Sequence, residues 1–277
     1  MALFSGPLAY LTDGAPSSLS AFPEVASFAQ VIGSTVTVAQ IQRSPNSNNQ
    51  PDSWFAAELA ALGNEAPIVA VPVNGIAATL AAMPELRGGA LVLQKPRRHS
   101  GAGRLLFGTT YERLLRESRL PMLILPNDGK IGTVRRILFP ADLAPRSLPV
   151  FDQTVALCRD LDADLVVLHV YGNDQLLPSE VDMERRLAAQ NLVELFNVHK
   201  QQITELVERA TVAGVRATAA HAEGRAHVKI LAHTAANPID LVVMPTHGPR
   251  SAEDVLQGST TVRVVQRAPV PVLVIRA

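Results

Sequence analysis

Two similar segments of the chain, 105–125 and 255–275, indicate its fold. They read LLFGTTYERLLRESRLPMLIL and VLQGSTTVRVVQRAPVPVLVI. Each has a glycine followed by a hydroxyl residue, then a helical pattern, and then a proline before a short apolar run. A second pair of similar segments, YLTDGAP from Tyr10 and LFPADLAP from Leu138, lies near the start of each half. We infer that the chain contains an internal duplication.

The two copies differ in length. Asp13 and Asp142 are 129 positions apart, whereas Gly108 and Gly258 are 150 apart, so the second copy has 21 more residues (150 minus 129). The extra length coincides with an amphipathic pattern over 178–213, which predicts one long helix. This helix would either shelter a crevice or build a contact between two copies of the chain.

Apolar runs alternate with helical patterns along the whole sequence, as in βαβ units around a parallel sheet. The runs are rich in valine, isoleucine and leucine with little alternation, which is typical of strands covered by helices on both faces. We predict five strands in each half. They cover residues 8–11, 35–41, 67–71, 90–93 and 121–125, then 136–139, 164–170, 215–220, 241–244 and 270–275.

Length and composition bound the class of protein. The 277 residues suffice for two domains, which we place at 1–127 and 134–277 because the polar stretch NDGKIGT between them is typical of a linker. The formal net charge is zero, so we expect no nucleic-acid partner. No run approaches the roughly 18 to 20 apolar residues of a membrane span, and the start of the chain lacks a signal-peptide pattern, so we expect a cytoplasmic protein. The single cysteine, Cys158, lies on the apolar side of a helical pattern and is predicted to be a packed thiol.

Polar residues follow two of the predicted strands of the second half. Ligands of open parallel sheets bind at the carboxyl ends of the strands, where the strand order reverses. Asp142 follows the strand at 136–139 and can accept hydrogen bonds from ribose hydroxyls or from a base amino group. Its alternative role is to cap the helix that follows.

The segment MPTHGPRSAEDVLQGST, residues 244–260, contains a candidate phosphate loop. Gly248 and Gly258 are separated by nine residues, and Gly258 opens a predicted helix. A helix N-terminus carries positive partial charge, glycine permits close approach by a phosphate, and the hydroxyls of Ser259 and Thr260 can donate. The same residues also serve as ordinary turn and cap residues.

Other chemistries find little support in the sequence. Ser259, His247 and Asp142 could form a hydrolytic triad, but no Gly-x-Ser-x-Gly elbow is present. No His-x-x-x-His pair and no Gly-x-x-x-x-Gly-Lys-Ser/Thr loop occurs either. We therefore predict no catalytic residue, no metal site and, at most, slow ATP hydrolysis.

These motifs resemble the universal stress protein family. The second half carries ADLA, then LHV, then DLVVMPTHG and, nine residues later, GSTTVRVVQRAPVPVLVI, and the first half is similar to a diverged copy. The resemblance implies a tandem protein with two α/β domains of the adenine-nucleotide-hydrolase (Rossmann-like) type. Each domain would be a five-stranded parallel sheet of order 3-2-1-4-5 flanked by helices. Some members bind ATP through Gly, two residues, Gly, nine residues and Gly-Ser or Gly-Thr, whereas others lack this motif.

The resemblance also implies a set of site residues. The aspartate that holds the nucleoside corresponds to Asp142, and the strand whose backbone meets the adenine corresponds to Val170. The cofactor-binding residues implied are Ala141, Asp142, Val170, Gly248, Gly258, Ser259 and Thr260.

This chain departs from the family pattern in both halves. Pro245 replaces the first glycine of the motif in the second half, and proline lacks a backbone N–H. In the first half we place Lys95 and Arg98 at the two early glycine positions, where their side chains would fill the nucleotide space. We therefore expect the first half not to bind ATP in the family's manner.

In the family's strand order, the last strand of each half is an apolar edge. Exposed apolar edges are a hazard unless they are paired. We expect the two last strands to pair with each other inside one chain, about a pseudo-two-fold axis.

Our functional hypothesis is a stress-response sensor or switch that binds an adenine nucleotide, ATP, in its second domain with little or no turnover. The alternative is a scaffold without a nucleotide site that binds a protein or a small apolar ligand.

Overall fold

A single sheet with helices on both faces forms the framework of the protein. The computed structural model describes residues 4–12, 20–42, 56–57, 60, 66–72, 83, 86–95, 114, 118–172, 182–246 and 259–277. The strands are β1 (Leu8–Thr12), β2 (Val36–Gln42), β3 (Ile68–Pro72), β4 (Ala90–Gln94), β5 (Met122–Leu125), β6 (Arg136–Pro140), β7 (Asp164–Tyr171), β8 (Ala217–Glu223), β9 (Leu241–Thr246) and β10 (Val272–Arg276). The helices are α2 (Phe22–Val31), α7 (Leu148–Leu161), α8 (Asp182–Val212), α9 (Ala226–Ala236) and α11 (Ser259–Arg267), with a short 3-10 helix at Pro145–Ser147.

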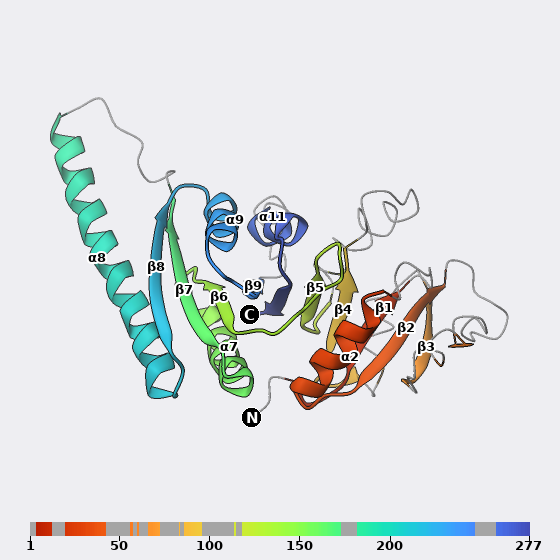
Figure 1. The fold of residues 1–277 in the computed structure, drawn as a ribbon. Helices are drawn as coiled ribbons and strands as arrows, with labels where there is room; N and C mark the ends of the chain where they lie inside the picture. The colour runs from red at the N-terminus through yellow and green to blue at the C-terminus, as the bar shows by residue number, and fades with distance from the viewer. Residues whose placement is uncertain are drawn as a thin grey trace.

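The strand order confirms the predicted architecture. The ten strands follow one another as β3-β2-β1-β4-β5-β10-β9-β6-β7-β8, which is the order 3-2-1-4-5 in each half (Figure 1). Pairing within each half is parallel. The last strands of the two halves, β5 and β10, pair antiparallel, with Leu123 opposite Leu273. The two apolar edges are therefore joined within one chain, as expected from the hazard of leaving them open.

The helices cover the two faces of the sheet separately. One buried cluster contains side chains of α2, α7 and α8, and the other contains side chains of α9 and α11. In Figure 1, α9 and α11 lie above the sheet, α2 and α7 lie below it, and α8 runs beside β8. Both clusters take residues from each half, so the core is continuous across the β5–β10 junction.

The segment between the halves is packed rather than free. Ile131 and Val134 are buried, and a carboxylate oxygen of Glu24 on α2 accepts from the backbone N–H of Ile131. Gly129 has a φ of +74°, and a methyl group added to it would lie 2.6 Å from Cβ of Ala21. Only glycine fits that position without strain.

Most element boundaries lie a few residues away from those predicted, and two of these differences concern α8 and β9. The predicted helix over 178–213 is α8, which runs from Asp182 to Val212. The strand predicted at 241–244 continues to Thr246 and includes Pro245. None of the helices in the described ranges is both long and apolar enough to cross a bilayer.

Candidate functional site

The strand order reverses between β6 and β9, where pairing ends early. Backbone pairing joins Ile137 to Leu241 and Leu138 to Val242 and goes no further along β6. On the other side of β9, pairing with β10 continues to Thr246 and Arg276. Open parallel sheets bind ligands where the strand order reverses, at the carboxyl ends of the strands. Here the carboxyl ends of β6 and β9 are not paired with each other, and we call this region the carboxyl edge.

Pro245 lies on β9 beside this edge. The backbone N–H of Val242 donates to the carbonyl of Pro271, so it faces β10. Successive N–H groups of a strand alternate between its two neighbours, so the nitrogen at 245 faces β6. Because pairing with β6 has already ended, the proline disrupts no ladder. It does remove one N–H donor from the carboxyl edge between β6 and β9.

Asp142 forms a local turn at the end of β6. Its Oδ1 accepts from the N–H of Ala144, 3.0 Å away, which is an Asx turn. Asp142 therefore does not cap α7, since the residue before that helix is Ser147. The next residue, Leu143, has a φ of +59°. A non-glycine residue in this region is strained, and such residues cluster at functional sites.

Two histidines fix the loop of Asp142 to α8. His169 on β7 is buried, with Nδ1 2.9 Å from the carbonyl oxygen of Ala141 and Nε2 3.0 Å from Nδ1 of His199 on α8. The carbonyl can only accept, so Nδ1 of His169 carries the proton, and Nε2 of the neutral ring accepts from His199. Burial lowers the pKa of His169 and also that of His199. Both rings are thus favoured in the neutral form, in which Nδ1 of His199 donates to Nε2 of His169.

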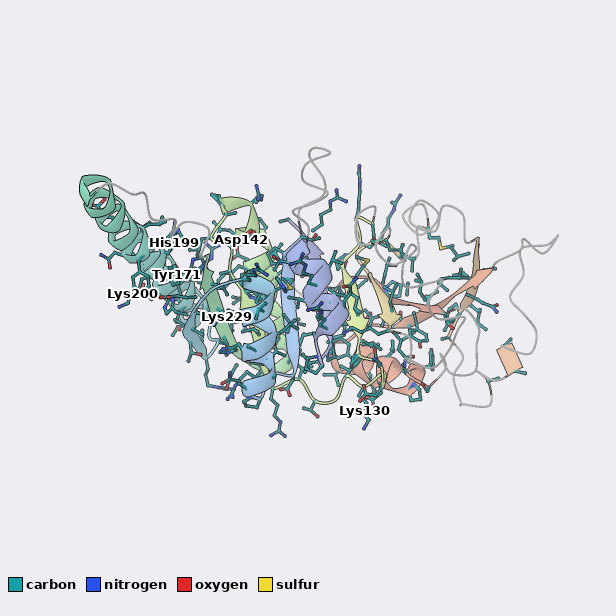
Figure 2. The ribbon with its side chains drawn as sticks, turned by 90° about the horizontal axis from the view of Figure 1, so that it is seen from above. Lys130, Asp142, Tyr171, His199, Lys200 and Lys229 are labelled. Carbon is teal, nitrogen blue, oxygen red and sulfur yellow. The ribbon has the colours of Figure 1, made fainter. Side chains whose placement is uncertain are left out.

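An aromatic stack extends this contact outward. The ring of Tyr171 lies 4.7 Å from the ring of Phe196, 6.0 Å from that of His199 and 5.9 Å from that of His221. Figure 2 shows Asp142, Tyr171 and His199 on the side of the second half that carries α8. Sequence patterns do not predict this cluster, because its members come from β7, β8 and α8 and follow no single periodicity.

The predicted adenine-side residues lie close together. The N–H of Ala141 donates to the carbonyl of Leu168, which places the start of the Asp142 loop beside β7. Val170 follows two positions later on β7, in register with Ala222 on β8. Its side chain packs on the α9 and α11 side of the sheet. Ala141, Asp142 and Val170 therefore occupy one corner of the carboxyl edge.

The predicted phosphate-side residues are only partly covered. Helix α11 begins at Ser259, as predicted, and Thr260 is half-buried in its first turn. Gly248 and Gly258 lie outside the described residues, as does the side chain of Ser259. Their part in a phosphate site stays a prediction.

Comparison with known proteins gives the family. The profile described as "Universal stress protein family" matches residues 133–276. The chain belongs to the universal stress protein family. Universal stress protein YxiE of Bacillus subtilis is 25% identical over 145 residues, which are 51% of this chain and 98% of that protein. A universal stress protein of Methanocaldococcus jannaschii is 27% identical over 145 residues, 51% of this chain and 82% of that protein.

One solved structure extends the likeness to both halves. A universal stress protein of Archaeoglobus fulgidus matches 99% of this chain and 98% of its own, with a TM-score of 0.64 and 16% identity. At that identity the match shows a shared fold. A universal stress protein solved in complex with cAMP matches 52% of this chain and 98% of its own, with a TM-score of 0.40 and 16% identity.

The first half of this universal stress protein has a different carboxyl edge. Pairing of β1 with β4 continues from Leu8 and Ala90 to Leu11 and Leu93, twice as far as between β6 and β9. The side chain of Gln94 follows directly, with Nε2 donating to the carbonyl of Asn127 at 3.3 Å. In the first half, the place where the strand order reverses is therefore filled by the β1–β4 backbone pairing and by the side chain of Gln94.

The strand register corrects one assignment made from the sequence. Leu8 and Ile137 are equivalent if Asp13 matches Asp142, and they pair with Ala90 and Leu241 respectively. Pro245 lies four positions after Leu241, and Gln94 lies four positions after Ala90. Gln94, not Lys95, is therefore the counterpart of Pro245. The sequence comparison was displaced by one position because no glycine remains in that stretch to fix the alignment. Arg98, Gly108 and Asp13 lie outside the described residues.

Two further side chains bear on the chemistry of this universal stress protein. Cys158 on α7 is buried, and burial raises the pKa of its thiol to about 12, so it is a packed thiol as predicted. No group of three or more histidine, cysteine or acidic side chains that could hold a metal ion occurs among the residues that the structure describes.

Proposed function

We propose that this universal stress protein binds an adenine nucleotide, ATP, at the carboxyl edge of β6, β7 and β9 and acts as a sensor or switch with little or no turnover. The observation that supports this most directly is the early end of β6–β9 pairing at Leu138 and Val242. It leaves the backbone at the carboxyl ends of β6 and β9, where the strand order reverses, without ladder pairing and next to Asp142. The nucleotide would bring the adenine to Ala141, Asp142 and Val170.

The phosphates would lie at the loop that leads into α11. Gly248, Gly258, Ser259 and Thr260 match the family motif in sequence, and the helix N-terminus at Ser259 offers N–H groups to an anion. The missing N–H of Pro245 faces the same edge, so we expect weaker binding than in a chain with glycine there. We place the nucleotide-binding domain at 134–277 and a diverged domain at 1–127, in a cytoplasmic protein.

Calorimetry with ATP tests the proposal on the intact chain. We expect one site per chain, abolished by Gly258→Val and unaffected by Gly108→Val, which changes the matching glycine of the first half. Nucleotide released by denaturing freshly purified protein should be adenine nucleotide. Equal loss of binding from both glycine variants would place the site elsewhere.

A second variant tests the role of Asp142 itself. Asp142→Asn keeps an oxygen acceptor for the N–H of Ala144 but removes the charge. We expect ATP to bind about tenfold more weakly, the effect of losing one charge-assisted hydrogen bond. If the wild type gives neither heat with ATP nor co-purified nucleotide, the scaffold alternative replaces this function.

A further inference from the structure

A cavity of about 450 Å³ lies between the β6–α7 connection and α8, on the face of the sheet away from α9 and α11. Small-molecule sites are about 300 to 1,000 Å³ in size. The cavity is lined by Phe139, Ala141, Asp142, Leu143, Ala144, Pro145, Ser147, Leu148, Phe151, Gln202, Glu205, Leu206 and Arg209. One of its walls therefore comes from α8, the helix that accounts for the extra length of the second half.

Apolar side chains line the interior of the cavity. Phe139 and Phe151 are each 1% exposed, and their rings meet edge to face with centroids 5.3 Å apart. Leu206 on α8 is also buried, whereas Leu148 is 39% exposed at the start of α7. An aryl or alkyl group of a ligand would be removed from water by contact with these side chains.

The charged groups of the lining favour a cation. Asp142 and Glu205 are both acidic, and Arg209 is the one cation among the lining residues that the structure describes. The charge of Arg209 is already compensated, because its guanidinium lies 2.6 Å from a carboxylate oxygen of Asp152. Glu205 makes a neutral contact, accepting from the side-chain amide of Gln201. Acidic groups thus outnumber basic ones among the described lining residues, which favours a cationic ligand over an anionic one.

A buried hydroxyl of the lining lacks a partner. Ser147 is 5% exposed, and its Oγ makes no hydrogen bond with any residue that the structure describes. It also makes no capping hydrogen bond to α7, although it is the residue before that helix. Unpaired buried polar atoms are costly, and native proteins rarely keep them without a function.

We propose that this cavity binds a small organic amine with an aryl or alkyl body. The body packs against Phe139, Phe151 and Leu206, and the ammonium group lies near Asp142 and Glu205. Ser147 supplies a further hydrogen-bonding group. The site does not depend on nucleotide binding, although Asp142 borders both sites.

Three probes with one body and different charges test this proposal. Phenylbutylamine, phenylbutanol and phenylbutyrate are titrated into the full chain and followed by calorimetry and by methyl NMR of the leucines. We expect the amine to bind about tenfold more tightly than the alcohol, and the carboxylate to bind least. Equal affinity of amine and alcohol, tighter binding of the carboxylate, or no binding of the amine up to its solubility limit would each overturn the proposal.

Two glutamates of α8 provide a matched pair of variants. Glu205 lines the cavity and Glu208 does not, and both are exposed on the same helix. Glu205→Gln should weaken the amine about threefold or more and leave the alcohol unchanged, while Glu208→Gln should change neither. The same effect from both variants would mean that only the general charge of the helix attracts the amine, which contradicts a site in the cavity.

A cavity-filling variant separates this site from the nucleotide site. Leu206→Trp should abolish binding of both the amine and the alcohol while ATP binding remains. Gly258→Val should do the reverse. A wild type that binds the amine but not ATP would refute the proposed function and leave the amine site standing, and a wild type that binds ATP but not the amine would refute the amine site. If Leu206→Trp fails to fold, the glutamate pair still decides the question.

Discussion

Lys95 Nζ donates a hydrogen bond to the carbonyl oxygen of Ala268, 2.7 Å away, and so joins the residue after β4 in the first half to the residue after α11 in the second. Lys95 is 7% exposed. No carboxylate pairs with it among the residues that the structure describes, so the carbonyl is the group that compensates its charge. Burial lowers the pKa of this ammonium group to about 8.

The Lys95 contact predicts that the free energy of unfolding changes with pH in the alkaline range. The pKa falls from 10.5 to about 8 on folding, so between these values the unfolded chain binds more protons than the folded chain. The free energy of unfolding of the wild type should therefore rise with pH across this window relative to Lys95→Met, by about 3 kcal/mol in full. Urea unfolding at both ends of the window measures this difference, and parallel pH curves for the two proteins would contradict it.

The histidine pair predicts a dependence at acid pH. Burial holds the pKa of both His169 and His199 below 6.5, so below that pH the unfolded chain binds more protons. Stability is then fully present above about pH 6.5 and falls as the pH is lowered through the folded pKa values. In His199→Phe the ring is kept and a titrating group is removed, so its unfolding free energy should fall less steeply with acid. An unchanged slope would exclude His199 as a source of the effect.

Gly129 and Gly132 offer a matched test of how the segment between the halves packs. Both have positive φ, but an added methyl group meets Ala21 and Gln94 at Gly129 and nothing within 4 Å at Gly132. Gly132→Ala should cost about 1 kcal/mol, the backbone penalty alone. Gly129→Ala should cost clearly more, because the methyl group also forces the segment away from α2. Chemical denaturation of the two variants measures both values. Equal losses in the free energy of unfolding would show that the segment can move away from α2 without cost.

The thiol of Cys158 predicts slow chemical labelling. With a pKa of about 12 and a buried side chain, it should react with a thiol reagent at neutral pH only when the chain opens. The labelling rate should rise with urea in parallel with unfolding. Fast labelling of the native protein would show that α7 opens locally.

Local sequence patterns were sufficient to predict the framework, because each strand carries its own apolar run. All ten strands appear in the structure, and the β5–β10 pairing follows from two apolar edges in one chain. The early end of β6–β9 pairing could not be predicted in this way, since it depends on how two distant strands diverge. The direction of the Pro245 nitrogen depends on the same strand register.

The parts of the candidate site that come from several elements were also missing from the prediction. The contacts of His169 with Ala141 and His199 join the loop after β6 to β7 and α8, and no motif links these residues. The cavity beside Phe139 likewise exists because α8 lies over the β6–α7 connection. Sequence periodicity predicted that α8 would form but not which loop it would cover.

The antiparallel contact of β5 with β10 has a consequence for how the two halves have diverged. When two such sheets belong to separate chains, dilution separates them and each can exchange partners with other copies. Here one backbone carries both, so the effective concentration of each half near the other is fixed by the covalent connection. Mutations in one half are never shared by its partner, and the first half can lose residues that the second half keeps.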